Sequence, residues 1–195
     1  KLLTSLALVN NNVPTPKTMF AFTTDAAMQA VEEIGYPAVL KPVTGSWGRL
    51  VAPLKDRDTA QAMIEFREQM DGPLSHIYYV QEMVERPPRD IRTIVVGDRL
   101  VACVYRHAPP DEWRTNIARG GKASPCPVTK ELEDIVLKAA KAVGGGVLGV
   151  DAMECPDGIV VHEVNSTVEF KGASSASEED IPGAIIDYVI QYSRR

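Results

Sequence analysis

Three side chains with oxygen ligands lie close together within residues 149–165, where the sequence pattern predicts a β-hairpin. Asp151 falls on the first strand, Glu163 and Asn165 fall on the second, and Pro156-Asp-Gly158 forms the turn. Residues two apart on a strand share a face, so we expect the hairpin to return Glu163 and Asn165 beside Asp151. Two carboxylates and an amide are hard ligands that suit Mg²⁺ bound together with a phosphate chain. The alternative is a solvated outer face of an antiparallel hairpin.

A second motif, residues 44–49, reads Thr-Gly-Ser-Trp-Gly-Arg and lies between two predicted strands. Gly45 and Gly48 allow a tight turn that directs backbone N–H groups at an anion. Lys41 ends the preceding strand, where its ammonium group could reach the same phosphates. The motif is not a Walker A loop, because no Gly-Lys-Ser/Thr follows it. A plain hairpin turn with a solvated lysine is the alternative.

The sequence Glu85-Arg-Pro-Pro-Arg-Asp90 is the best candidate for a hinge between two subdomains. The strand before it ends in Gln81-Glu-Met-Val84, whose backbone groups could pair with the edge of adenine. A strand that simply ends at a linker is the simpler interpretation. After the hinge, Asp90 and Arg92 alternate so that they share one face of the next strand.

Charge is distributed unevenly along the chain. Residues 86–122 contain eight Lys or Arg against four Asp or Glu, a net +4 within a chain of −5. Such a run is usually a solvated face, but this asymmetry suggests an anionic substrate or an acidic partner. The overall negative charge argues against general nucleic-acid binding. Three cysteines without a Cys-x-x-Cys pair suit a reducing cytoplasm without disulfides or zinc, and we find no membrane span.

Hydrophobic content of 45% and charged content of 24% are typical of a soluble globular protein. Strands and helices alternate over residues 14–82 and predict a small α/β unit. Beyond it the pattern predicts a hairpin over 91–107, a polar loop over 108–127, and helices at 130–143 and 182–193. We expect residues 14–84 to form a small subdomain, with 1–13 and 85–195 forming a larger one. Residues 1–11 already predict a helix and the first residue is Lys1, so we expect the natural chain to begin earlier.

The motifs occur in one order along the chain, which is more specific than any single motif. They are Lys41-Pro, Gly45-Ser-x-Gly48, Gln81-Glu82, Asp90-Ile-Arg92, Arg114-Thr-Asn-x-x-Arg-Gly-Gly121, Gly149-Val-Asp151 and Glu163-Val-Asn165. In this order the chain resembles the ATP-grasp carboxylate–amine ligases over nearly its whole length. Asn165-Ser-Thr-Val-Glu-Phe-Lys171 is similar to the amino-group carrier-protein ligases of lysine biosynthesis. These enzymes are related to the RimK-type ligases, which add glutamate to a protein tail.

The resemblance implies an α+β ATP-grasp fold with two α/β subdomains clasping ATP, and an N-terminal domain that this chain lacks. It implies a cytoplasmic ligase that activates the C-terminal glutamate carboxylate of a small acidic carrier protein as an acyl phosphate. The acyl group is then joined to the amino group of α-aminoadipate or glutamate, in lysine or arginine biosynthesis. ATP and Mg²⁺ are the implied cofactors, and a homo-oligomer without nucleic-acid or membrane partners is expected. The alternatives are a RimK-like ligase and a nucleotide-binding module that has lost catalysis.

The resemblance also implies roles for individual residues. Asp151, Glu163 and Asn165 would bind Mg²⁺, and Arg119 with Asn116 would stabilise the oxyanion while Lys41 contacts phosphates. Nucleotide contacts are expected from Lys1, Lys41, Gly45, Ser46, Trp47, Gly48, Arg49, Gln81, Glu82, Met83, Val84 and Asp90. Substrate contacts are expected from Arg92, Arg114, Asn116, Arg119, Asn165, Glu169 and Lys171.

Overall fold

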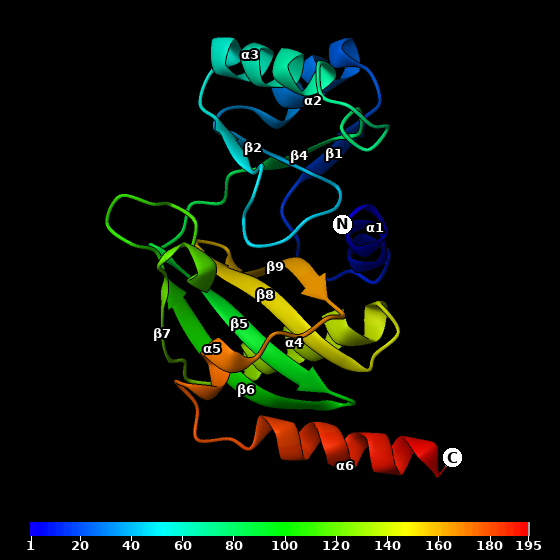
Figure 1. The fold of residues 1–195 in the computed structure, drawn as a ribbon, viewed down its shortest axis with the longest axis vertical. Coiled ribbons are helices and arrows are strands. Elements are labelled where there is room, and N and C mark those ends of the chain that lie inside the picture. Colours follow the sequence, from blue (N-terminus) through cyan, green and yellow to red (C-terminus); the bar gives the residue numbers. More distant parts are fainter. Residues whose placement is uncertain (195) are drawn as a thin grey trace. The chain divides into compact units, whose positions relative to one another are not determined.

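A computed structural model describes residues 1–194, which divide into two compact units. Unit 1 comprises Lys1–Leu3 and Pro16–Val84, and unit 2 comprises Thr4–Thr15 together with the chain from Glu85 onward. Each unit contains an antiparallel sheet and helices, so the expected α+β class is confirmed (Figure 1).

Unit 1 is a four-stranded sheet in the order β1-β4-β2-β3, in which every neighbouring pair is antiparallel. Its strands are β1 (Thr18–Ala21), β2 (Ala38–Lys41), β3 (Ala52–Leu54) and β4 (Tyr78–Glu82). Helices α2 (Thr24–Ile34) and α3 (Arg57–Glu68) lie side by side on one face and bury the apolar residues of this unit (Figure 1). The sheet is therefore covered on one side, as its short, apolar strands require.

Capping residues set where the helices of unit 1 begin. The hydroxyl of Thr23 accepts from the N–H of Ala26, so Thr23 is the N-cap of α2. Asp56 caps α3 in the same way by accepting from the N–H of Thr59 at 2.8 Å. Gly35 ends α2 with φ of 92°, a conformation that residues with a Cβ rarely adopt.

Arg67, near the end of α3, is a buried cation that binds backbone carbonyls. It donates to Ser75 at 2.9 and 3.1 Å and to Lys41 at 3.2 Å, with longer contacts to Leu74 and Ile77. Burial lowers the pKa of its guanidinium group. Arg67 thus fixes the segment that joins α3 to β4, and it holds the backbone at Lys41.

We expect Arg67→Met to lower the free energy of unfolding of unit 1 by about 3 kcal/mol, because buried carbonyls lose their donor. The change can be measured by hydrogen exchange of the β2 and β4 amides under native conditions. Arg57→Met is the matched control, since Arg57 is exposed in the first turn of the same helix. A loss no greater than in this control would contradict the role given to Arg67.

Unit 2 is a five-stranded antiparallel sheet in the order β7-β6-β5-β8-β9. Its strands are β5 (Arg89–Val96), β6 (Arg99–His107), β7 (Lys122–Pro125), β8 (Val147–Cys155) and β9 (Gly158–Asn165). Its helices are α1 (Leu2–Asn10), α4 (Lys130–Ala142), α5 (Lys171–Ser174) and α6 (Ile181–Ser193), with a 3₁₀ turn at Ile117–Arg119. β7 and the 3₁₀ turn lie within the expected polar loop, and α5 was not expected.

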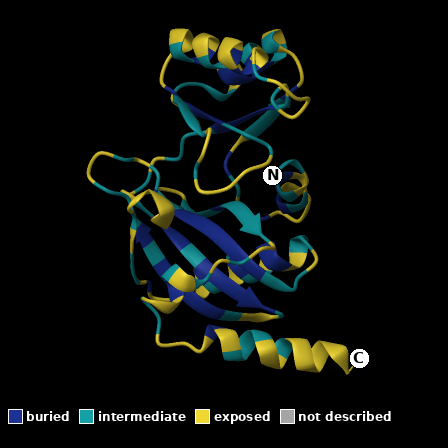
Figure 2. Cartoon of the chain, viewed as in Figure 1, coloured by how far each residue is buried: buried dark blue, intermediate teal, exposed yellow. Residues whose placement is uncertain are grey.

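The two faces of the unit 2 sheet differ in what they bury. Residues such as Ile91, Val150 and Val161 point to one face and form an apolar core with Leu8 of α1 and with α4. The other face is apolar only near α5 and α6, where Ile94 and Val104 contact the C-terminal helices. Buried residues follow β5, β6 and β8 for most of their length (Figure 2). The remaining end of this second face carries the charged side chains of Asp90, Arg92, Arg106 and Asp151, and we call it the polar end of the sheet.

A β-bulge interrupts the β8–β9 hairpin. From the turn, Cys155 pairs with Gly158 and Ala152 pairs with Val161, but Asp151 pairs with Glu163. His162 is therefore the extra residue on β9. The bulge places Glu163 on the same face as Asp151, whereas unbroken alternation from the turn would direct Glu163 towards the apolar core.

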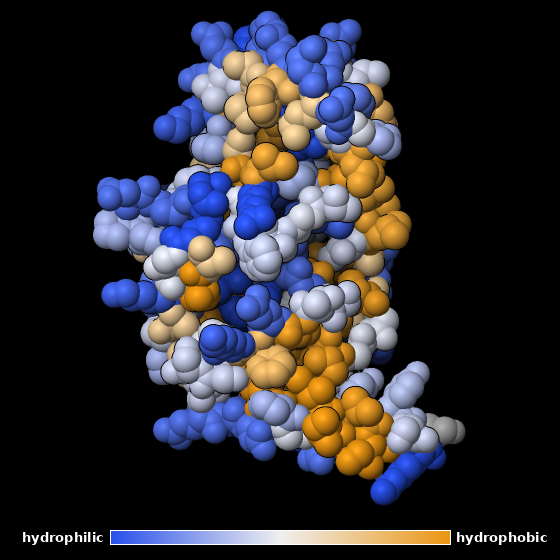
Figure 3. Space-filling model, viewed as in Figure 1, coloured by the Kyte–Doolittle hydropathy of each residue, from blue (hydrophilic) through white to orange (hydrophobic). Residues whose placement is uncertain are grey.

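The surface of α6 carries several hydrophobic side chains, visible as an orange area over this helix in Figure 3. Ile186, Val189, Ile190 and Tyr192 are exposed there, while Ile181 and Tyr188 pack on the sheet. Within residues 1–194, every helix is too short or too polar to cross a membrane.

Candidate functional site

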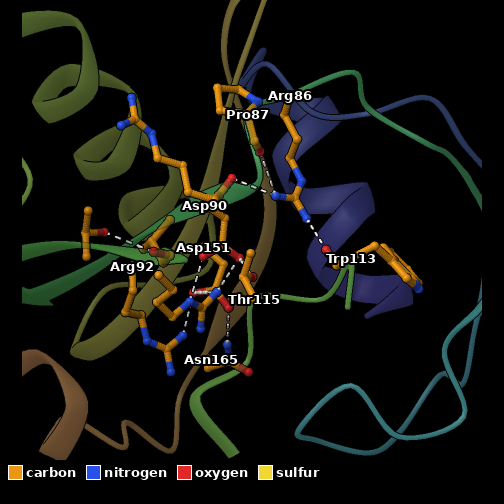
Figure 4. A network of polar contacts seen from close by, with 12 residues as sticks. Arg86, Pro87, Asp90, Arg92, Trp113, Thr115, Asp151 and Asn165 are labelled. Atoms are coloured by element: carbon orange, nitrogen blue, oxygen red, sulfur yellow. Dashed lines mark hydrogen bonds and ion pairs between the residues drawn. The ribbon is translucent and has the colours of Figure 1, made fainter. Parts of the chain in front are cut away.

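The polar end of the sheet holds an alternating set of buried ion pairs (Figure 4). Arg106 on β6 donates from Nε and Nη2 to the two oxygens of Asp90 on β5, both at 2.7 Å. Its Nη2 also lies 3.1 Å from Oδ1 of Asp151 on β8. Arg92 donates to the same Oδ1 at 2.7 Å. Two carboxylates and two guanidinium groups thus balance each other on three adjacent strands.

The charge on Asp151 is stabilised by these arginines. Burial alone would raise the pKa of Asp151, which is only 4% exposed, but Arg106 and Arg92 outweigh burial and lower the pKa from 3.8 to about 2. The ionised form is therefore favoured in the folded state. Its contribution to stability is complete above pH 4 and is lost as the pH falls towards 2.

Gly149 on β8 makes room for Arg92. A Cβ placed on Gly149 would lie 3.0 Å from Cζ and 3.1 Å from Nη1 of Arg92, which is tighter than ordinary contact. The guanidinium group therefore lies against the backbone of β8 beside Asp151. Gly149 and Asp151 together fix the position of Arg92.

We expect Gly149→Ala to displace Arg92 and to weaken its ion pair with Asp151, lowering the free energy of unfolding by about 1–2 kcal/mol. Chemical denaturation can measure this loss. In an Arg92→Ala background the same change should be neutral or stabilising, because the space is empty and alanine favours a strand over glycine. An equal loss in both backgrounds would show that Arg92 is not the group displaced.

Glu163 and Asn165 share the face of Asp151, as expected from the sequence, although the placement depends on the bulge at His162. Glu163 is the direct partner of Asp151 across the β8–β9 pair, and Asn165 is the partner of Gly149. Nδ2 of Asn165 donates to Oδ2 of Asp151 at 3.4 Å (Figure 4). The set contains only oxygen donors from carboxylates and an amide, which fits Mg²⁺ in type. Among the described residues, no three His, Cys, Asp or Glu side chains group at ligand distance, so the amide would be needed.

Asp90 has a different environment from the one expected of a nucleotide contact. Its carboxylate is 4% exposed, and it accepts from Arg106 and from the hydroxyl of Thr115. Both oxygens are therefore already hydrogen-bonded within unit 2. This geometry makes Asp90 an anchor for Arg106 and for the following loop.

Residues 112–121 follow β6 and form what we call the arginine loop. Glu112 accepts from Nε and Nη2 of Arg114 at 2.9 and 2.8 Å and from Nε of Arg119 at 2.9 Å. The hydrogen bonds from Arg114 outweigh the opposing effect of burial and, with those from Arg119, lower the pKa of Glu112 to about 2. The loop brings the predicted Arg114, Asn116 and Arg119 into one short segment. Glu112 was not among the predicted residues.

In unit 1, Lys41 and Gln81 belong to one hydrogen-bonded group. Nζ of Lys41 donates to Oε1 of Gln81 at 2.5 Å. Nε2 of Gln81 donates to the hydroxyls of Thr18 and Tyr79 at 2.8 and 3.0 Å. Gln81 is fully buried, so its side chain positions Lys41 and is not presented to a ligand.

The backbone after Gln81 is partly committed to the sheet. The N–H of Glu82 donates to Lys17 and the N–H of Met83 donates to Pro37, while Oε1 of Glu82 accepts from the N–H of Lys17. Glu82, Met83 and Val84 are predicted to contact adenine through their backbone. Of their three N–H groups, that of Val84 makes no hydrogen bond within the described residues.

The glycine-containing loop of unit 1 has an unusual backbone. Gly45 and Gly48 have positive φ, as do Trp47 at 61° and Leu50 at 56°. Non-glycine residues seldom adopt this conformation, and it often marks a functional loop. Trp47 is about half exposed, and the guanidinium of Arg49 lies 5.0 Å from its ring centroid. The loop therefore presents Trp47 and a cation together at the surface.

The other predicted residues lie at the ends of elements. Lys1 precedes α1 and is half-buried, and Ser46 is exposed in the glycine-containing loop. Glu169 and Lys171 are exposed at the start of α5, after Asn165 has left the sheet.

The net positive charge of residues 86–122 does not form a broad exposed surface. Arg89 pairs with Glu154, and Arg86 donates to carbonyls of the neighbouring chain, including Trp113 at 3.0 Å. Arg92, Arg106, Arg114 and Arg119 are paired as described, which leaves Arg99 and Lys122 as the cations of this stretch that are exposed and outside these pairs. The charge count alone therefore gives little support to an acidic partner.

Sequence reasoning missed the anchoring roles of Arg106, Thr115 and Glu112. Arg106 is the direct cross-strand partner of Asp90 only because the β5–β6 pairing shifts by one residue between Ile94 and Val95, and regular alternation about the turn at Gly97 would have paired Asp90 with Tyr105. Thr115 and Glu112 lie in a loop without periodicity, so no signal pointed to them either.

The sequence matches the RimK-like ATP-grasp domain family over residues 1–189, and the chain belongs to this family. It is 37% identical to the alpha-aminoadipate–LysW ligase LysX of Saccharolobus solfataricus, covering all of this chain and 71% of that protein. It is 39% identical to the glutamate–LysW ligase ArgX of Sulfolobus acidocaldarius, covering 97% of this chain and 67% of that protein. The chain thus spans about two thirds of the length of these relatives.

Among solved structures, the chain is similar to a RimK domain protein ATP-grasp from Sphaerobacter thermophilus. The TM-score is 0.75 at 27% identity, over 96% of this chain and 66% of that one. The ATP-grasp fold expected from the sequence is therefore confirmed.

Proposed function

We propose that this chain is the ATP-grasp part of an ATP-dependent carboxylate–amine ligase. Its substrates are the C-terminal glutamate of a small acidic carrier protein and the amino group of α-aminoadipate or glutamate. The observation that carries the proposal is the polar end of the sheet, in a chain similar along its length to two named LysW ligases. ATP is the implied phosphoryl donor, because the chain belongs to a family of ATP-grasp domains.

The proposed reaction has two steps, formation of an acyl phosphate and attack on it by the amine. A carboxylate oxygen bonds to the γ-phosphorus of ATP and the bond to the β–γ bridging oxygen breaks, releasing ADP. The amine nitrogen then bonds to the acyl carbon, the bond from that carbon to the phosphate oxygen breaks, and inorganic phosphate and a proton leave. Neither step needs a protein nucleophile, which agrees with cysteines that are partly or fully buried.

Residues of both units are assigned to this chemistry. In unit 1, Lys41 and the loop of residues 44–49 bind phosphates, and residues 82–84 contact adenine. In unit 2, Asp151, Glu163 and Asn165 would hold Mg²⁺, which when bound would offset negative charge on the phosphates. Arg119 and Asn116 stabilise charge on the acyl oxygen, and Arg92 and Arg114 contribute positive charge near the substrates. Glu169 and Lys171 are the proposed contacts to the amino acid.

An ADP-release assay of the purified protein tests this function. Carrier protein with either aminoadipate or glutamate is expected to give ADP and a carrier extended by one amino acid, detectable by mass spectrometry. ADP release with free glutamate and another protein tail, in the absence of the carrier, would favour the RimK-like alternative. If no combination of protein and amino acid gives ADP, the remaining alternative is a nucleotide-binding module that has lost catalysis.

A further inference from the structure

Glu112 is the one carboxylate of the arginine loop that contacts both Arg114 and Arg119. Oε2 accepts from Nη2 of Arg114 at 2.8 Å and from Nε of Arg119 at 2.9 Å. Oε1 accepts from Nε of Arg114 and from the backbone N–H groups of Trp113 and Arg114. The adjacent backbone N–H groups therefore hold the carboxylate in place independently of the two arginine side chains.

The contact to Arg119 uses only the inner nitrogen of the guanidinium group. Within residues 1–194, Arg119 makes its side-chain hydrogen bond through Nε, and its side chain is 33% exposed. Nη1 and Nη2 form the terminal edge of the planar group, which faces a different direction from the Nε–H bond and is not used in the hydrogen bond to Glu112. This edge presents two parallel N–H donors, the arrangement that binds a carboxylate, a phosphate or an oxyanion.

The backbone of the arginine loop is also fixed. Thr115 donates its hydroxyl to Asp90, which ties the loop to the ion pairs at the polar end of the sheet. A Cβ on Gly121 would lie 2.5 Å from the carbonyl oxygen of Thr115. The backbone of the loop therefore packs against itself at Gly121 more closely than a residue with a side chain would allow. The N–H of Arg119 donates to the carbonyl of Asn116 at 2.9 Å. Glu112 thus adds the last constraint, on the side chain of Arg119.

We propose that Glu112 is a positioning residue, which holds Arg119 by Nε so that Nη1 and Nη2 face the reacting acyl group. This inference rests on the proposed function. An arginine on a partly exposed loop otherwise samples several rotamers, and a misplaced stabilising group loses much of its effect on the transition state. Glu112 acts through Arg119 and does not itself contact substrate.

Glu112→Gln keeps the size of the side chain and removes its charge, so it tests the proposal directly. We expect kcat for carrier-dependent ADP release to fall about 10- to 100-fold, with KM for ATP unchanged. In an Arg119→Ala background, Glu112→Gln should cause no further loss. Asp111→Asn, at an exposed neighbour in the same segment, is the matched control and should leave kcat unchanged.

Additive losses in the two backgrounds, or an unchanged kcat in Glu112→Gln, would overturn the proposal. NMR of the Arg119 Nε–H provides a readout that does not depend on turnover. We expect its signal to be protected from exchange in the wild type and lost in Glu112→Gln, with the amides of β6 unchanged. Protection in both proteins would show that Glu112 does not hold Arg119. No ADP release by the wild type would instead overturn the proposed function.

Discussion

Arg106→Met is expected to lower the free energy of unfolding of unit 2 by about 3–5 kcal/mol. Arg106 is buried and, among the described residues, it is the guanidinium group that forms ion pairs with both Asp90 and Asp151. Its removal leaves two carboxylates that are each only 4% exposed, with Arg92 as the remaining guanidinium partner of Asp151. The cost of such uncompensated charge exceeds the loss of the hydrogen bonds themselves.

Hydrogen exchange of the β5 and β6 amides measures this effect for unit 2 alone. Arg99→Met is the control, because Arg99 lies exposed on the same strand and its replacement should change stability by less than about 0.5 kcal/mol. Adding Asp90→Asn to Arg106→Met should recover part of the loss, since one uncompensated charge is removed. A loss below about 1 kcal/mol for Arg106→Met would mean that Arg106 does not anchor this end of the sheet.

Glu163→Gln is expected to abolish ADP release and to leave the fold intact. The substitution keeps the shape of the side chain but removes the charge that a divalent cation needs from this ligand. Glu163 lies opposite Asp151 at the end of the hairpin and is half-buried, so the neutral amide can be accommodated. The effect should therefore appear in turnover and not in the unfolding transition.

Glu154→Gln is the matched control, with the same chemical change in the same hairpin. Glu154 pairs with Arg89 and is about one third exposed, so its loss should have little effect on stability or on ADP release. Turnover of Glu163→Gln at the wild-type rate would remove Glu163 from the proposed metal site. Equal inactivation by both substitutions would indicate a general effect on the hairpin.

The elements that could be predicted from the sequence are those with strong periodicity. The apolar stripes of α2, α3 and α4, and the alternation about the turn at Gly97, placed most helices and strands within a few residues. β7 was missed because Lys122–Pro125 is short and polar, and it becomes a strand only by pairing with β6. α5 was missed because its four residues follow no pattern of their own.

The candidate site could be predicted as a set of residues but not as a set of contacts. Alternation within single strands placed Asp90 on the face of Arg92 and Glu163 on the face of Asn165, and the order of motifs pointed to Arg119. Which charges pair with one another depends on the alignment of neighbouring strands. The sequence therefore showed an excess of positive charge where the structure has nearly balanced ion pairs. The resemblance assigned Asp90 and Gln81 to the nucleotide, whereas in the structure protein groups bind the polar atoms of both side chains.

The extra residue in β9 also decides how the hairpin responds to a change in chain length. Deleting His162 would let Glu163 follow Val161 directly, and regular alternation would then keep Glu163 and Asn165 on the face of Asp151. Deleting Val164 would instead move Asn165 to the position opposite Val150, on the side of the apolar core. Loss of His162 should therefore be found among functional variants more often than loss of Val164.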